Sequence, residues 1–175
     1  LCRSPFLCTQ AEIENFMEHP PEGCREPWEA LQAQVPKHLQ QTVLEFGYRV
    51  FCLEKDVQKQ AQLAQAWATY EAAMNVYPMQ APTIGLGNPD ALIARYRVQS
   101  HYLWHRCFVG PNILAQAHRM SEIPLTLVHG DRDALCPFEN SHDIQRAVPQ
   151  ANLIRVAGGG HDLTDPGMLS ATFQA

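Results

Sequence analysis

Three side chains in the last third of the sequence have the types and spacing needed for acid–base chemistry. Asp131 and Asp133 follow an apolar run, and His161 follows three successive glycines. Imidazole has an ordinary pKa of about 6.5, so it can take up and return a proton near neutral pH. A carboxylate that accepts a hydrogen bond from one ring nitrogen determines which nitrogen acts as the base. The residue types therefore predict a histidine base and an acid that orients it.

Two predicted strands would bring these residues together. Residues 125–128 and 152–156 are short apolar segments of the kind found in buried strands. The carboxyl ends of parallel strands share one edge of a sheet, where catalytic side chains collect. An acid after one strand and a histidine after the next form the second half of a Ser…Asp…His arrangement. Asp133 could instead cap a turn before the following helix, and Asp131 is a rival acid two residues earlier.

The nucleophile of such an arrangement is missing from the sequence. No serine lies in a G-x-S-x-G turn, which exposes the reactive hydroxyl in one large class of hydrolases. The thiol of Cys136 lies close to Asp133 in sequence and could in principle attack, but no such turn positions it. The serines considered are Ser4, Ser100, Ser121, Ser141 and Ser170.

Composition narrows the class of protein. The chain has 175 residues, 46% of them hydrophobic, which is enough for one globular domain with a substantial core. A net charge of -5 and the lack of a Lys/Arg-rich run argue against nucleic-acid binding. No apolar stretch approaches the roughly 20 residues of a membrane span. We therefore expect a soluble, cytoplasmic protein without a nucleic-acid or membrane partner, and six scattered cysteines predict reduced thiols rather than disulfides or a zinc site.

The hydrophobic periodicity changes near Met120. Before this point the apolar residues recur every three or four positions, which predicts helices, and no strand is expected there. After it, strand and helix alternate, which is typical of a parallel sheet. The predicted helices are one beginning after Thr9 and others over residues 27–35, 39–53, 57–76, 89–107, 111–120, 138–147 and 166–173, with a loop over 78–89.

Four separated motifs resemble those of the prolyl iminopeptidase family, which are α/β-hydrolases. They are Trp67-Ala-Thr-Tyr-Glu71, Arg97-Val-Gln-Ser-His-Tyr102, His129-Gly-Asp-Arg-Asp-Ala-Leu-Cys-Pro137 and Gly159-Gly-His161. The resemblance covers nearly the whole chain and implies an α/β fold, the C-terminal portion of an α/β-hydrolase. Residues 1–115 would form a mostly helical cap, or lid. Residues 116–175 would supply two parallel core strands with flanking helices.

The same resemblance implies roles for four residues. The catalytic acid falls on Asp133 and the base on His161, in agreement with the spacing, whereas the serine lies in an N-terminal core that this sequence lacks. Glu71 matches a cap carboxylate that holds the free amine of an N-terminal proline. Gln99 departs from the family, whose Ile-Glu-x-His-Tyr motif has a glutamate there. Losing a charged hydrogen bond of about 1.5 to 3 kcal/mol would lower kcat/KM roughly 10- to 100-fold.

The implied activity is therefore that of a serine aminopeptidase that releases N-terminal proline from peptides. It requires no metal or organic cofactor. We expect this chain alone to be inactive, because the nucleophile would lie in the N-terminal hydrolase core. That missing core would be the partner of this chain. Two alternatives remain open: a hydrolase of other small amides or esters, and a non-catalytic helical binding module.

Overall fold

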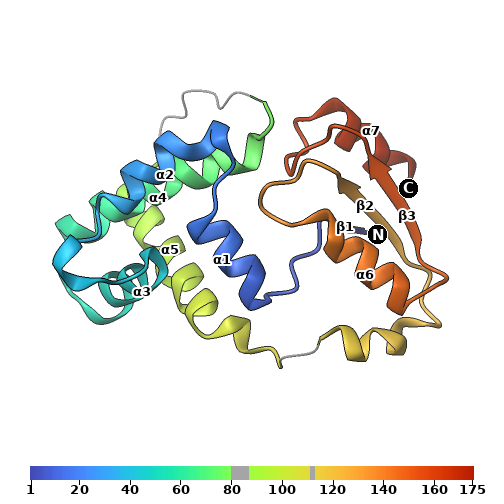
Figure 1. Ribbon diagram of the computed structural model, residues 1–175, viewed down its shortest axis with the longest axis horizontal. Coiled ribbons are helices and arrows are strands. Elements are labelled where there is room, and N and C mark those ends of the chain that lie inside the picture. Colours follow the sequence, from blue (N-terminus) through green and yellow to red (C-terminus); the bar gives the residue numbers. More distant parts are fainter. Residues whose placement is uncertain (80–86, 111–112) are drawn as a thin grey trace.

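The computed structural model describes residues 1–79, 87–110 and 113–175, and these form a helical part beside a small sheet (Figure 1). Helices α1 to α5 gather on one side of the molecule, and the strands lie with α6 and α7 on the other. Part of the loop predicted over 78–89, and the start of the helix predicted over 111–120, lie outside the described residues. No helix in the described ranges is long and apolar enough to cross a membrane.

The sheet has three parallel strands in the order β1-β2-β3. Thr126 pairs with Asn152 and Gly130 with Val156, which sets the two longer strands in register. The α/β fold class with two parallel strands is confirmed. The third strand was not predicted, because two residues are too few to show an alternating pattern. The strands are β1 (Cys2–Arg3), β2 (Thr126–Gly130) and β3 (Asn152–Val156).

Two helices support the sheet. Helix α6 (Phe138–Ala147) connects β2 to β3, and α7 (Pro166–Gln174) follows β3. Both pack against β2 and β3, as predicted from the strand and helix alternation. Asp165 caps the first turn of α7 by accepting hydrogen bonds from two backbone N–H groups.

The five helices of the helical part begin largely where the sequence predicts. Thr9 and Glu12 form both hydrogen bonds of a capping box before α1. The helix predicted over 39–53 differs: it starts after Thr42, whose side chain caps it, and ends in a π-helical turn over Arg49–Leu53. The helices are α1 (Gln10–Glu18), α2 (Arg25–Gln32), α3 (Val43–Tyr48), α4 (Val57–Val76) and α5 (Pro89–Trp104). Short 3₁₀ turns cover Glu22–Cys24, Lys37–Leu39, Arg106–Phe108 and Leu114–Met120, the last within the predicted 111–120 helix.

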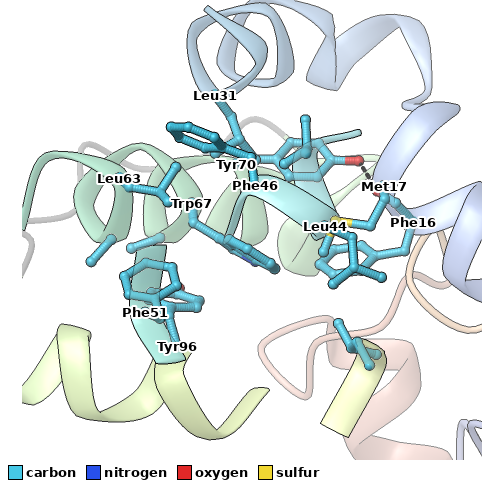
Figure 2. Packing of buried hydrophobic residues seen from close by; sticks show 14 of the residues in the cluster. Phe16, Met17, Leu31, Leu44, Phe46, Phe51, Leu63, Trp67, Tyr70 and Tyr96 are labelled. Carbon is cyan, nitrogen blue, oxygen red and sulfur yellow. Dashed lines mark hydrogen bonds between the residues drawn. The ribbon is translucent and has the colours of Figure 1, made fainter. Parts of the chain in front are cut away.

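Aromatic residues from α4 and its neighbours fill the core of the helical part (Figure 2). Trp67 stacks on Tyr96 with ring centroids 5.4 Å apart, and both side chains are almost fully buried. Tyr70 lies against Phe16, and its hydroxyl donates to the Phe16 carbonyl at the end of α1 (Figure 2). Burying a large apolar side chain stabilises a fold by about 1.5 to 3 kcal/mol. This packing fixes α4 and α5 side by side.

A buried carboxylate and a disulfide link the start of α1 to other elements. Glu12 accepts hydrogen bonds from the Leu7 backbone N–H at 2.9 Å and from the amide of Asn140 on α6. Cys8 and Cys107 form a disulfide across 99 residues of sequence. The prediction that all six cysteines are reduced is therefore wrong for this pair, because spacing gives no sign of partners so far apart.

Candidate active site

The predicted base and acid meet at the carboxyl ends of two adjacent strands. The Nδ1 atom of His161 lies 2.9 Å from Oδ2 of Asp133, at hydrogen-bond distance. The Asp133 side chain is fully buried, and the His161 side chain is 20% exposed. Asp133 follows β2 and His161 follows β3, so the sheet brings together residues 28 positions apart.

Several hydrogen bonds hold the Asp133 carboxylate in place. Its Oδ1 accepts from the backbone N–H groups of Leu135 and Cys136, both at 2.9 Å. Burial alone would raise the pKa of Asp133. Hydrogen bonds from His129 and His161, the His161 charge and the Cys136 N–H outweigh burial and hold the pKa well below its usual range. Asp133 is therefore an ionised acceptor.

A second histidine, His129, lies against the same carboxylate. It is fully buried, and its Nε2 lies 2.8 Å from the Cys136 carbonyl oxygen and 3.4 Å from Oδ2 of Asp133. Its Nδ1 lies 2.7 Å from the Ser141 hydroxyl on α6. The two acceptors beside Nε2 place a proton on that nitrogen, so His129 donates toward Asp133 and the Cys136 carbonyl. Sequence reasoning missed this support, although His129 lies four residues before the acid.

The rival acid, Asp131, has other partners. Its Oδ2 accepts from Arg155 Nε at 2.9 Å, and its Oδ1 accepts from the Gly158 N–H at 2.7 Å. The Gly158 hydrogen bond, followed by Arg155, lowers the pKa of Asp131. Asp131 therefore braces the loop that carries His161, and Asp133 is the acid that contacts the histidine.

Glycines allow that loop to pack closely against its neighbours. A Cβ atom on Gly160 would lie 2.0 Å from the Tyr77 carbonyl oxygen, and one on Gly130 would lie 2.3 Å from the Gly159 oxygen. Gly158 has φ +73°, a conformation that side chains disfavour. The glycine loop thus approaches neighbouring backbone closely, and this packing fixes the backbone just before His161.

A pocket of about 270 Å³ opens beside His161 and contains both predicted substrate-binding residues. Glu71 comes from α4 and Gln99 from α5, so the helical part supplies one wall and the sheet loops supply the other. Asp133 stands outside the pocket, hydrogen-bonded to His161. The lining residues are Phe6, Phe16, Glu71, Gln99, Tyr102, Leu103, Leu135, Cys136 and His161.

Glu71 is a largely buried carboxylate whose two oxygens have different partners. Oε1 accepts from Arg95 Nη2 at 2.9 Å, and Oε2 accepts from the Tyr96 hydroxyl at 2.8 Å. Burial, and then the Glu71 charge, raise the pKa of Tyr96, so this hydroxyl keeps its proton. Neither partner was predicted. The one hint of Arg95 in the sequence is that it lies four residues before Gln99, which is about one turn away on the same helix, α5.

The serines and the pocket cysteine offer no evident nucleophile. Ser4 is the serine whose position is most like that of a nucleophile, because it directly follows strand β1 and has a φ of 44°. Its Oγ, however, is buried without a hydrogen-bond partner in the described ranges. It does not line the pocket. Burial, and then the Asp133 charge, raise the pKa of the Cys136 thiol, which keeps it protonated.

Asp133, Cys136 and His161 also offer one metal-ligand atom each within 4.8 Å of one another. A thiol binds metal as the thiolate, and Asp133 already accepts a hydrogen bond from His161. These contacts favour an acid–base pair over a metal centre. With Nδ1 bound to the carboxylate, Nε2 is the nitrogen that can accept a proton from a nucleophile.

Curated relatives match the chain over nearly all of its length. It is 28% identical over 176 residues to the proline iminopeptidase of Xylella fastidiosa strain Temecula1, covering 97% of this chain and 55% of that protein. Proline iminopeptidases of Xanthomonas citri and Arabidopsis thaliana are 27% and 25% identical, covering 99% and 95% of this chain and 56% and 45% of their own lengths. The resemblance seen in the motifs is thus confirmed. The chain spans about half the length of the curated relatives it matches, and no protein-family model matches it.

Proposed function

We propose that this chain, which resembles proline iminopeptidases over nearly its whole length, is the C-terminal part of a serine aminopeptidase that releases N-terminal proline from peptides. The carrying observation is the hydrogen-bonded pair of Asp133 and His161 beside a pocket that Glu71 and Gln99 also line. In this proposal, residues 1–115 act as the cap and residues 116–175 as part of the hydrolase core. Strand β1 belongs to the cap range in sequence but pairs with the core strand β2.

The proposed mechanism assigns one step to each residue. A serine from a part of the protein outside this sequence attacks the carbonyl of the first peptide bond. Nε2 of His161 takes the serine proton and returns it to the leaving amine, while Asp133 holds Nδ1 and stabilises the imidazolium. In serine proteases that use such a triad, changing the acid to its amide lowers kcat by about 10⁴.

The helical part would set the substrate's position. Glu71 and Gln99 would accept hydrogen bonds from the free amine of the first residue. An anchored amine leaves only the first peptide bond within reach of the nucleophile, which makes the enzyme an exopeptidase. The pocket volume of about 270 Å³ suits one small side chain such as a proline ring.

One observation supports a second candidate function. Glu71 already pairs with Arg95, and Gln99 is neutral, so the pocket presents less negative charge than two free carboxylates would. A hydrolase of other small amides or esters fits a pocket of this kind. Preference for an uncharged acyl ester over a proline substrate would favour this candidate.

The test is to sequence the coding DNA upstream of Leu1, express the complete reading frame, and assay two substrates. Proline 4-methylcoumaryl-7-amide carries the free amine, and its N-acetyl derivative lacks it. We expect an upstream G-x-S-x-G and turnover of the free amine only. A complete protein without that motif, or one that hydrolyses both substrates equally, would refute the aminopeptidase proposal.

A further inference from the structure

The substrate pocket shares one wall residue with a second cavity. This cavity has a volume of about 260 Å³, and Glu71 lines it as well as the pocket beside His161. Arg95 and Tyr96 line only the second cavity, whereas Gln99 and His161 line only the first. Glu71 therefore lines the substrate pocket, while the two residues that hydrogen-bond its carboxylate, Arg95 and Tyr96, line the other cavity.

The two partners of Glu71 differ in how firmly they are held. Tyr96 is 1% exposed, so its hydroxyl has little access to water as a replacement for Glu71 as acceptor. The Arg95 side chain is 55% exposed, against 14% for that of Glu71. A guanidinium at the surface can exchange a carboxylate for water at little cost. Arg95 is therefore the adjustable partner, and Tyr96 is the fixed one.

Counting charges shows what Arg95 does to the pocket. With the arginine in place, the pair of Glu71 and Arg95 is neutral, and Gln99 adds no charge. An arriving ammonium group would then meet a carboxylate whose charge is already compensated. Without the arginine, the same ammonium would meet an uncompensated carboxylate that is largely buried, where charges interact more strongly than in water.

We infer that Arg95 is a specificity-determining residue that weakens the hold of Glu71 on a substrate ammonium group. It acts through Glu71 and does not touch the substrate pocket. The inference rests on the proposed function, since it concerns the residue expected to hold the amine. It also predicts that the pocket accepts weakly basic or neutral ligands alongside N-terminal amines.

The experiment compares two ligands that differ in one group. L-Proline amide carries the ring ammonium, and tetrahydrofuran-2-carboxamide has an ether oxygen in its place. Dissociation constants would be measured by NMR titration for the 175-residue chain and for the R95Q variant. We expect R95Q to bind proline amide about two- to fivefold more tightly, the range for removal of a partly exposed ion-pair partner. Binding of the oxygen analogue should not change.

Two control variants separate the possible explanations. R146Q removes an exposed arginine from an ion pair with Asp143 on α6, so it lowers the net charge equally while leaving the pocket intact. It should leave both affinities unchanged. In the E71Q background, adding R95Q should no longer raise the affinity for proline amide, because the effect passes through the carboxylate.

The outcomes distinguish this inference from the function on which it rests. If wild type prefers proline amide, E71Q removes that preference, and R95Q leaves it unchanged or reduces it, then Arg95 positions Glu71 and the inference fails alone. If R95Q binds the two ligands equally, or binds neither, no ammonium site exists at Glu71, and both the inference and the aminopeptidase proposal fail.

Discussion

Replacing Asp133 with asparagine should change both the tautomer of His161 and the stability of the chain. The carboxylate accepts from the N–H groups of Leu135 and Cys136 on one oxygen, and from His161, with His129 Nε2 3.4 Å away, on the other. An asparagine has one acceptor oxygen, and the two backbone donors hold it in place. Its NH₂ group then faces Nδ1 of His161, which must give up its proton and become an acceptor.

The magnitude follows from the bond that is lost. A hydrogen bond to a charged group contributes about 1.5 to 3 kcal/mol, and the Asp133 side chain is fully buried. We therefore expect Asp133→Asn to lower the free energy of unfolding by about 2 kcal/mol at pH 7. The pKa of Asp133 is depressed in the folded state, so its stabilising effect is present above the unfolded value of about 3.9. This stabilising effect is lost as the pH falls below that value and through the folded pKa. The unfolding free energies of the wild type and the variant should therefore converge at low pH.

Urea unfolding at pH 7, 5 and 3 measures the free energy of unfolding of both proteins. Long-range ¹H–¹⁵N NMR of the His161 imidazole identifies the protonated nitrogen. The wild type should carry the proton on Nδ1 of His161, and the variant should carry it on Nε2. Asp131→Asn is the matched control, because Asp131 contacts Arg155 and Gly158 instead of His161. The reasoning is wrong if Asp133→Asn leaves the proton on Nδ1, or if the stability difference is the same at pH 3 as at pH 7.

Three further outcomes are expected. The pure 175-residue chain should not hydrolyse proline 4-methylcoumaryl-7-amide, and any turnover that copurifies with it would contradict the proposed missing nucleophile. In the complete protein, Gln99→Glu should raise kcat/KM for that substrate roughly 10- to 100-fold by adding a charged hydrogen bond; an unchanged value would remove Gln99 from the amine site. Cys107→Ser should lower the urea-unfolding free energy by about 2 to 4 kcal/mol, since it opens the link to Cys8 across 99 residues, whereas the free Cys52→Ser should have little effect.

The pairing of Asp133 with His161 could be predicted because its determinants are local. Each residue follows a short apolar strand, and parallel strands place their carboxyl ends together. Helix α4 was predicted with the bounds that the structure gives, because twenty residues provide several turns of apolar periodicity. Their catalytic roles stay predictions until the complete protein is assayed.

The features that sequence reasoning missed depend on contacts between distant segments. Strand β1 is two residues long and forms only because β2 lies beside it. Arg95 reaches Glu71 because α4 and α5 pack together, and Cys8 finds Cys107 through the overall fold. The cytoplasmic location also stays a prediction, and a disulfide is uncommon in that compartment.

The most direct test of the proposed function is to find the serine that His161 activates. The complete protein and its His161→Gln variant would be treated with a fluorophosphonate, and the labelled residue would be located by mass spectrometry. We predict one labelled serine in a G-x-S-x-G preceding Leu1, with labelling at least 100-fold slower in the variant, as expected when a general base is lost. A label on Ser4, or labelling of the variant at the wild-type rate, would contradict the proposal.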